Sequence, residues 1–551
     1  MLNYENLVRL LDDQVDRLLP AQVMDSSRAD FGGFVSDGIA QPTSVSSLSS
    51  LAYAYALEES RHYGCDEILS RILAGAAFGR HIRRDSGCFD LLPTNFDSSP
   101  DTGFMVKALA PAVRAVRSMK GSGAEEVENA LGEIIRAAVP GMVSGGFHTP
   151  NHRWVLVAAL SQALTLYPDL EGMHVVEQYL AETIDVNEDG EFIERSAGGY
   201  NAIINRSLRL AAEALNRPEL LEPVRKNLDL SYHLLHADGT VVTSFSKRQD
   251  HGQRIVLIDM VDSYYHLARH DENGFYGAVA DWLFSIAPGN VPWALQPFVD
   301  HPEWREDDLE RETLPDRYAK IYPTARIWRV RRGETSATAG AGSPAPFSVR
   351  QGNVELTSVS TSASYFAIAQ FSGETFSETD GRIRMTHQTR GDFHDRPVYY
   401  LPVGEPVGFE EFFDHRQERE VYALPPLETA LEIEEVQGGF DIGVSCTGYD
   451  RVPFQIACDF APGGEVELGD GSFMGRAGEE MFLKSKELIY RVGNDAISIG
   501  PGQCAHQFRH MRGSEPAPNA FRVLITLVTP VEHTLQIRCG KWSLVEERLC
   551  P

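Results

Sequence analysis

The period of the apolar residues changes once along the chain, between residues 300 and 325, and this change constrains the fold more than any other feature. Before it, apolar residues recur every three or four positions in segments such as "HRWVLVAALSQALTLY", the pattern of amphipathic helices. After it, short segments such as "FRVLITLVT" are rich in Val, Ile, Phe and Thr and are separated by Gly, Asp or Pro, which is typical of antiparallel strands. We therefore predict a helical domain at 1–310 and an antiparallel β-sandwich at 311–551.

Two stretches show neither the helical spacing of apolar residues nor the strand pattern, and we interpret them as loops. The Pro- and charge-rich segment "PFVDHPEWREDDLERETLPDRY" marks the boundary between the domains. The small residues of "GETSATAGAGSPAPFS", at 333–348, indicate a flexible surface loop. A length of 551 residues, which is too great for one hydrophobic core, agrees with at least two domains.

Five loops in the helical half share one shape, in which a glycine is followed by an apolar residue, a polar stretch and the start of a helix. They lie at 31–44, 85–102, 144–154, 188–201 and 237–252. Taking Gly33, Gly87, Gly146, Gly190 and Gly239, the spacings are 54, 59, 44 and 49 residues. This period fits a repeated helical hairpin, and stacked hairpins form an open solenoid or close into an α/α toroid. In a toroid the five loops would converge on one rim.

The net charge, the N-terminal stretch and the cysteines indicate which partners and which location to expect. The net charge of −28 argues against nucleic acid and anionic membranes as partners, although a local group of Arg and His can still bind an anionic small substrate. No apolar run reaches the roughly 18 residues that span a bilayer. The start "MLNYENLVRLLDDQVDRLLPAQ" lacks the basic region of a signal peptide, and the seven cysteines form no CxxC pair. We therefore expect reduced thiols and a cytoplasmic location. We expect neither nucleic acid nor a membrane as a partner, and a homodimer is the oligomeric state to test.

The loops bring together amide, imidazole, guanidinium and phenol side chains. The residues of interest are Asn95, Asp97, Asp101, Asn151, His152, Arg153, Trp154, Glu194, Arg195, Tyr200, Arg248, Gln249 and His251. Taken singly, Asp101 and Asn151 are also typical helix N-caps, and the arginines are also typical ion-pair partners on solvated faces. Their joint occurrence at equivalent positions of the repeat favours a common site.

This set suits abstraction of a proton next to a carboxylate. In β-elimination on a uronic acid, Asn and Arg donors neutralise the carboxylate and stabilise the developing negative charge. His or Tyr then removes the C5 proton, and Tyr protonates the leaving glycosidic oxygen. A glycoside hydrolase would instead need two carboxyl groups about 5–9.5 Å apart, and Asp97, Asp101, Glu191 and Glu194 are candidates for that pair. A non-catalytic glycan-binding protein is the third alternative.

Three stretches carry a family resemblance: "NHRW" at 151–154, "DGEFIERSAGGYN" at 189–201 and "TNFDSSPDTGF" at 94–104. They resemble, in this order, an Asn-His-Arg helix start, a loop that ends in the catalytic tyrosine, and a cleft segment of the heparinase II/III-like and chondroitin AC–alginate lyase superfamily of polysaccharide lyases. The resemblance implies an incomplete α/α toroid followed by a β-sandwich. It also implies a carbon–oxygen lyase that acts on a uronic-acid-containing oligosaccharide.

The resemblance also implies roles for individual residues. Asn151 would neutralise the substrate carboxylate, Tyr200 would be the acid and in part the base, and a histidine would complete the set. Several members carry that histidine where this chain has Arg195, so His152, His251 or a histidine of the β domain would take its place. The expected catalytic residues are Tyr200, His152, Asn151 and Arg195. The expected substrate-binding residues are Asn95, Asp97, Arg153, Trp154, Arg248, Gln249, His251 and His387.

Metal content follows from the same resemblance. Some relatives hold a zinc ion in the β domain, and the candidate ligands here are His387, His394, Asp395, His506 and His510. Their spacing does not match a tight zinc motif, so the sequence predicts no required cofactor.

Overall fold

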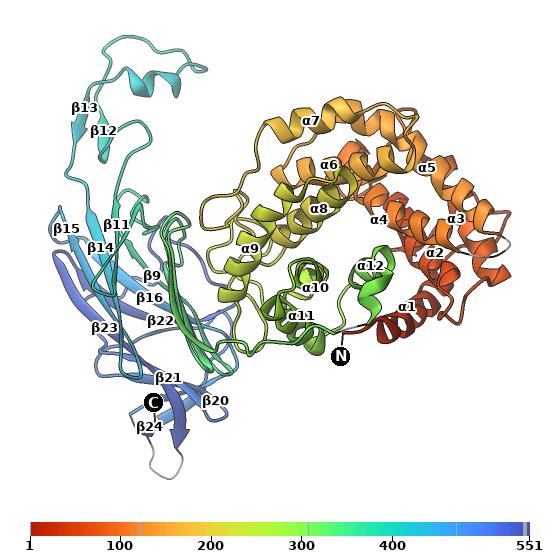
Figure 1. Cartoon of the computed structure of the whole chain (residues 1–551). Helices are drawn as coiled ribbons and strands as arrows, with labels where there is room; N and C mark the ends of the chain where they lie inside the picture. Colours follow the sequence, from red (N-terminus) through yellow and green to blue (C-terminus); the bar gives the residue numbers. More distant parts are fainter. Residues whose placement is uncertain are drawn as a thin grey trace. The chain divides into compact units, whose positions relative to one another are not determined.

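The chain folds into two compact units (Figure 1). The computed structural model describes residues 2–119, 121, 123–306, 308–469, 471–543 and 548–550. The helical unit comprises Met1–Tyr232, Asp238–Val241 and Ile255–Leu314, and the β unit comprises His233–Ala237, Val242–Arg254 and Pro315–Pro551. The segments 233–237 and 242–254 therefore pack with the β unit, whereas the periodicity had assigned them to the helical domain.

The helical unit holds the helices that the three-to-four periodicity predicts. They are α1 (Tyr4–Leu18), α2 (Leu48–Ala56), α3 (Asp66–Ile82), α4 (Ser99–Ser118), α5 (Ala124–Gly145), α6 (Pro150–Leu166), α7 (Met173–Ala181), α8 (Tyr200–Leu215), α9 (Leu221–His233), α10 (Val261–His270), α11 (Gly274–Ile286) and α12 (Val291–Asp300). Only α12 was not predicted, because Pro292 and Pro297 interrupt its pattern. No described helix has both the length and the hydropathy needed to cross a membrane.

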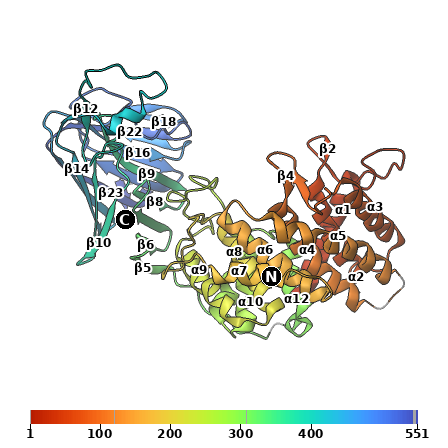
Figure 2. The same ribbon diagram turned by 90° about the horizontal axis from the view of Figure 1, so that it is seen from above.

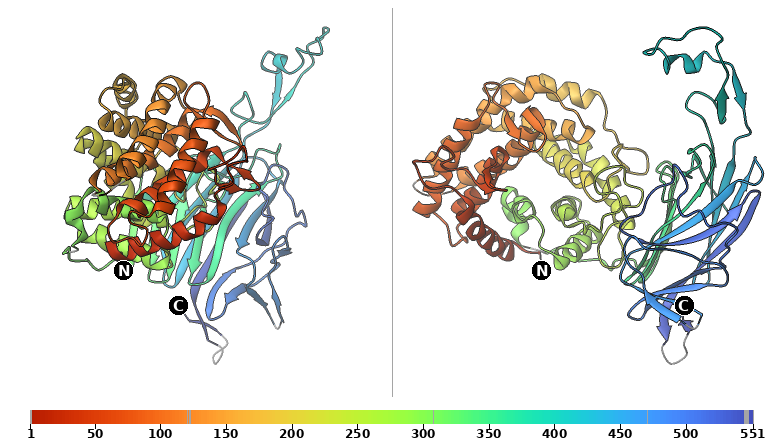
Figure 3. Two further views of the ribbon diagram at one scale, coloured as in Figure 1. Left: turned by 90° about the vertical axis from the view of Figure 1, so that its right-hand side faces the viewer. Right: turned by 180° about the vertical axis from the view of Figure 1, so that it is seen from behind.

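The helices form two layers around a ring (Figure 3). In the inner layer α2, α4, α6 and α8 pack side by side in chain order, and α10 and α12 continue the layer. The outer helices α3, α5 and α7 each pack on the inner helix that precedes them. Since α12 also contacts α1 and α2, it lies between the two ends of the helical chain. This arrangement is the α/α toroid that the hairpin repeat predicts.

In three of the five loops a glycine has the same packing reason. Gly32, Gly87 and Gly190 have positive φ angles of 87°, 98° and 88°. A Cβ atom at these positions would lie 1.9–2.3 Å from a backbone oxygen of Ala74, Ala137 or Lys226, in the outer helices α3, α5 and α9. Each of these loops therefore presses against the backbone of the outer helix of its own hairpin, which only glycine permits. In the first loop this glycine is Gly32 rather than its neighbour Gly33.

The β unit is built from two sheets. The larger has the order β10-β11-β14-β15-β23-β21-β20-β17-β18, with β24 on β23, and the smaller has the order β19-β22-β16-β9-β8-β7-β6-β5. Their strands are β5 (Arg317–Tyr322), β6 (Ile327–Arg332), β7 (Thr335–Gly340), β8 (Phe347–Gln351), β9 (Val354–Ala363), β10 (Thr375–Thr379), β11 (Arg382–Gln388), β14 (Glu428–Val436), β15 (Gly439–Thr447), β16 (Pro453–Phe460), β17 (Glu465–Leu468), β18 (Gly471–Met474), β19 (Glu480–Phe482), β20 (Leu488–Val492), β21 (Asp495–Gly500), β22 (Phe521–Val528), β23 (Val531–Ser543) and β24 (Arg548–Cys550). A short two-stranded ribbon of the same unit pairs β12 (Val398–Tyr400) with β13 (Val421–Ala423), and two others in the helical unit pair β1 (Val35–Ser36) with β2 (Ile39–Ala40) and β3 (Phe89–Leu91) with β4 (Asn95–Ser98).

The two sheets enclose one apolar core, which confirms the β-sandwich (Figure 2). Ile433 and Ile537 of the larger sheet share this core with Val349 and Ile525 of the smaller. The described pairings are antiparallel except that β19 runs parallel to β22.

The interpretation of 333–348 as a flexible loop was wrong. Half of this stretch forms β7 and the start of β8, and Ala337 and Ala339 are fully buried. These small side chains belong to the core between the sheets, a role that composition alone does not reveal.

Candidate functional site

The inner helices α4, α6 and α8 begin at one edge of the ring. Phe104, in the first turns of α4, makes an edge-to-face contact with His152 in the first turn of α6, with ring centroids 5.9 Å apart. Asn151 of α6 in turn contacts Glu194 in the loop before α8. These contacts place the second, third and fourth loops of the repeat side by side, and we call their shared edge the rim.

Tyr200 is the first residue of α8 and its side chain is partly exposed. Gly198 and Gly199 precede it, and Gly199 offers no side chain to cap the helix. Ser196 fills that role, because its hydroxyl accepts the Tyr200 N–H at 3.1 Å and its carbonyl accepts the Asn201 N–H at 3.2 Å. Ser196 thus fixes the backbone of Tyr200 at the start of α8.

Asn151 and Glu194 form a buried pair. Glu194 accepts hydrogen bonds from the backbone N–H of Asn151 at 3.2 Å and from its Nδ2 at 2.8 Å. The carboxylate therefore caps the N-terminus of α6 from the neighbouring loop. Asn151 is fully buried, and its Nδ2 also donates to Thr149 at 3.2 Å. A substrate carboxylate would have to displace one of these acceptors before Asn151 could bind it.

Arg195 adopts a left-handed backbone conformation, with φ of 51°. This conformation is costly for a residue with a side chain and is often found at functional sites. The guanidinium forms an ion pair with Glu191 at 2.9 Å, and its side chain is only 7% exposed. Arg195 is therefore held inside the fourth loop, a few residues before Tyr200.

His152 is partly exposed at the rim. Besides Phe104 it contacts the ring of His148 edge to face, with centroids 4.6 Å apart. The more exposed His148 was not among the predicted site residues, although it lies in the same loop.

The second loop contributes a polar network. Asn95 donates to Asp101 at 2.9 Å, and Ser98 donates to the same carboxylate oxygen at 2.5 Å. Asp97 accepts a hydrogen bond from the Ser86 hydroxyl, and its side chain is exposed. Asp101 is nearly buried in the first turn of α4, so two neighbouring side chains fix its orientation.

Arg153 and Trp154 point away from the rim's exposed surface. Trp154 is fully buried and donates from Nε1 to Asp185 at 2.6 Å. Arg153 pairs with Asp185 at 2.8 Å and with Glu182 at 2.9 Å. The structure gives these two predicted substrate-binding residues a packing role, because a helix that begins with Asn-His at the rim turns the next two side chains towards the outer layer.

The remaining predicted residues lie in the β unit. Arg248, Gln249 and His251 belong to the segment 242–254, which packs within the β unit. His251 is exposed and its Nδ1 lies 2.9 Å from the Ser246 carbonyl. His387 lies in β11 with its Nδ1 3.4 Å from the Ser372 hydroxyl, and burial lowers its pKa below the ordinary value.

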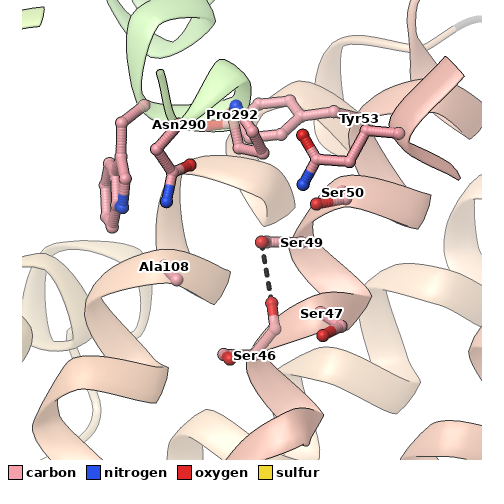
Figure 4. Close-up of a pocket in the computed structure, with 10 residues that line it drawn as sticks. Ser46, Ser47, Ser49, Ser50, Tyr53, Ala108, Asn290 and Pro292 are labelled. Atoms are coloured by element: carbon pink, nitrogen blue, oxygen red, sulfur yellow. Dashed lines mark hydrogen bonds between the residues drawn. The ribbon is translucent and has the colours of Figure 1, made fainter. Parts of the chain in front are cut away.

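A cavity of about 290 Å³ opens among the inner helices below the rim. Asp101 and Phe104 of α4 and Ile203 of α8 line its upper part, so it begins one helical turn from Tyr200. Trp293 of α12 and Arg206 of α8 line it as well. A smaller cavity of about 160 Å³ adjoins it through shared wall residues, and there Ser49, Ser50 and Asn290 face one space (Figure 4).

The larger cavity has a cationic wall that the sequence did not reveal. Lys107 is almost fully buried, donates to Ser207 at 3.0 Å and lies 4.9 Å from the centre of the Phe104 ring. Burial and the neighbouring Arg206 lower the pKa of Lys107 well below its usual value. Arg206 lies 4.7 Å above the Trp293 ring and pairs with Asp262 at 2.7 Å. Aromatic faces beside a cation suit a sugar that carries an anionic group.

Comparison with known proteins agrees with this architecture. No protein-family model matches the chain, and no curated protein matches it in sequence. Among solved structures, heparinase III matches with a TM-score of 0.52 and 12% identity over 89% of this chain and 75% of that chain. The Streptomyces coelicolor A3 chondroitin AC lyase in complex with chondroitin sulphate matches with a TM-score of 0.55 and 12% identity over 99% of this chain and 80% of that one. A Paenibacillus xanthan lyase matches with a TM-score of 0.55 and 9% identity over 97% and 57% of the two chains.

The chain has the fold of the polysaccharide lyases. The resemblance inferred from three short motifs is thereby confirmed at the level of the fold, over nearly the whole chain. In this polysaccharide lyase fold the motifs "NHRW" and "DGEFIERSAGGYN" start the adjacent inner helices α6 and α8. The structure thus brings together Tyr200, Asn151, His152 and Arg195 on one rim.

The zinc site considered for the β domain is not assembled from its five candidate residues. His506 has its Nε2 3.0 Å from the Phe454 carbonyl, and the exposed His510 has its Nδ1 3.8 Å from Glu480. Among the described residues, the group of His and carboxylate atoms with spacing suited to a metal lies instead in the helical unit of this lyase fold, at Glu213, His266 and His301.

Proposed function

We propose that this protein is a lyase that cleaves a uronic-acid-containing oligosaccharide by β-elimination. The observation that carries the proposal is the partly exposed Tyr200 at the start of α8, on the rim of a polysaccharide lyase fold. The matched proteins are named as lyases of chondroitin and xanthan and as a heparinase, which supports an acidic glycan as substrate.

In the proposed reaction a base removes the proton on C5 of the uronate. The electron pair of that C–H bond forms a C4=C5 double bond, and the C4–O glycosidic bond breaks with its electrons on the leaving oxygen. Tyr200 protonates this oxygen, and either its phenolate or His152 takes the C5 proton.

Recognition of the uronate needs positive charge, because Glu191 and Glu194 make the fourth loop acidic. Arg195 is the cation of that loop, and Arg206 is the cation of the cavity below it. Asn151 acts here chiefly as a positioning residue, since its pairing with Glu194 fixes the loop that carries Tyr200. We expect the sugar ring to lie over the rim with its acidic group directed towards these cations.

The direct test is a screen of oligosaccharides that differ in their uronic acid. A lyase product carries a double bond conjugated to the carboxylate, so turnover raises the near-ultraviolet absorbance. We expect Tyr200→Phe to reduce kcat about 10²–10⁴-fold, because it removes the proton donor while leaving the ring. Tyr167→Phe is the matched control, because Tyr167 lies beyond the opposite end of α6, about 24 Å from Asn151.

The same screen separates the alternatives. New reducing ends without new absorbance would indicate a hydrolase, and ligand binding without product would indicate a glycan-binding protein. Equal activity of the wild type and Tyr200→Phe would contradict the role of Tyr200.

A further inference from the structure

A cluster of two histidines and one glutamate lies in the helical unit away from the rim. Glu213 belongs to the last turn of α8, His266 lies in α10, and His301 directly follows α12. One ligand atom from each residue lies within 4.8 Å of the other two. The closest approaches are 2.8 Å between His301 Nε2 and Glu213 Oε1, and 3.5 Å between His266 Nδ1 and the same oxygen.

The buried ring of His266 lacks hydrogen-bond partners in this cluster. Its side chain is 1% exposed, yet neither ring nitrogen has a hydrogen-bond partner. Buried polar groups are nearly always satisfied, so an orphaned imidazole with a carboxylate oxygen 3.5 Å away requires an explanation. A metal ion between the two atoms supplies one, because neutral imidazole is a common metal ligand.

We propose that Glu213, His266 and His301 bind a divalent first-row transition metal ion, of which Zn²⁺ is the representative. Two imidazoles and one carboxylate form a ligand set that Zn²⁺ uses in proteins, with water completing the tetrahedron. Ligand atoms of such a tetrahedron lie about 3.3 Å apart, so the pair at 3.5 Å already fits. The pair at 2.8 Å opens by about 0.5 Å when the metal replaces the proton between them.

The surroundings orient these ligands. Glu303 lies 3.2 Å from Nδ1 of His301, leaving Nε2 to face Glu213, as in the carboxylate–histidine–metal arrangement of many sites. Trp304 stacks on His301 with ring centroids 3.9 Å apart, which fixes the plane of the imidazole. Arg209 lies 3.9 Å from the other oxygen of Glu213, and Asp262 at 2.9 Å balances its charge.

The position of the cluster assigns the metal a structural role. Glu213 is thirteen residues after Tyr200 on one helix, which separates the two by about 20 Å. The ion would join α8 and α10 to the end of α12, the helix that contacts α1. It would therefore fasten the late helices of the ring to the first one, without touching the substrate.

The test uses the full-length chain, stripped of metal with a chelator, and Zn²⁺ or Co²⁺ alone as the probe. We expect the wild type to bind one equivalent of Zn²⁺ with a rise in Tm, and to give the intense visible bands of tetrahedral Co²⁺. His266→Phe keeps a ring against Trp304 but removes a ligand, so we expect at least a tenfold loss of affinity and no Tm response. Glu303→Gln should weaken binding by about 10–100-fold, as removal of an outer carboxylate does.

His270→Phe is the matched control, because its ring lies one turn further along α10, 6.0 Å from that of His266, and outside the cluster. Its binding should equal that of the wild type. Failure of the wild type to bind an equivalent of Zn²⁺, or binding that His266→Phe and Glu213→Gln leave unchanged, would overturn the proposal. No glycan is needed, so this result is independent of the proposed lyase activity.

Discussion

The start of α8 and its middle differ in how exposed their polar and charged side chains are. At its N-terminus Tyr200 is partly exposed, follows two glycines and is capped by a serine. Further along the helix Arg206 and Arg209 share Asp262, and the side chains of all three are at most 8% exposed. Burial alone would raise the pKa of Asp262, but the two guanidiniums hold it below the ordinary value. A partly exposed phenol therefore lies where the helix begins, and a buried group of paired charges lies along its middle.

This contrast predicts that mutations of the buried charged groups that pack against α8 act on stability, and that mutations in the loop before α8 also act on catalysis. Four variants test it, ordered by the expected change in the free energy of unfolding.

Asp262→Ala should have the largest effect. It leaves Arg206 and Arg209 buried without a counter-charge, which costs about 3–5 kcal/mol. Denaturant unfolding measures the loss. The control is Asp169→Ala, which removes the exposed partner of Arg136 and should leave stability unchanged. Equal effects of the two substitutions would show that burial does not distinguish these pairs.

Lys107→Met should stabilise the protein by about 1–4 kcal/mol at neutral pH, since an apolar chain of similar size replaces a buried amine. The pKa of Lys107 is lowered in the folded state, so the unfolded chain binds the extra proton. The stability of the wild type therefore rises with pH up to the unfolded pKa of 10.5. The difference in unfolding free energy between the variant and the wild type should therefore shrink between about pH 7 and about pH 9.5. A difference that does not change with pH would contradict the lowered pKa of Lys107.

Glu194→Gln keeps the shape of the carboxylate but removes its charge. Hydrogen bonds to a charged group contribute about 1.5–3 kcal/mol, and we expect a loss of up to that size, because Asn151 donates two such bonds. The variant should also lose activity, since the loop before Tyr200 is no longer fixed. Glu182→Gln serves as the comparison, because Glu182 is half exposed and pairs with the outward-facing Arg153.

Arg195→Gly should have the smallest effect on stability. The loss of the ion pair with Glu191 is offset by relief of the left-handed conformation, which costs a side chain about 1–2 kcal/mol. Activity should still fall, mainly through KM, if the guanidinium binds the uronate. Arg195→Lys, which retains the charge, should recover part of that activity. Unchanged kinetics in both variants would remove Arg195 from the site.

The sequence predicted the rim better than the cavity. The loop before α8 was recognisable because a glycine stands at a fixed place in a repeat, and because the motif that ends in Tyr200 resembles one in known lyases. Lys107, Arg206 and Trp293 carry no such signal, since a cationic residue within an apolar helical pattern looks like a solvated position. The sequence pattern did not indicate α12 either, because proline is unfavourable inside a helix. Packing against α1 and α2 stabilises this helix in spite of its prolines.

The amino-acid sequence by itself determined the two classes of secondary structure, the hairpin repeat and the loops that begin α4, α6 and α8. These features follow from periodicity and from residues with special backbone conformations, which act over a few positions of the chain. Only the tertiary structure decided that Asn151 pairs with Glu194, that the fifth loop packs with the β unit, and that Glu213, His266 and His301 meet. Such contacts join residues that lie 35 or more positions apart in the chain, and they form because burial of apolar helix faces brings distant polar groups together.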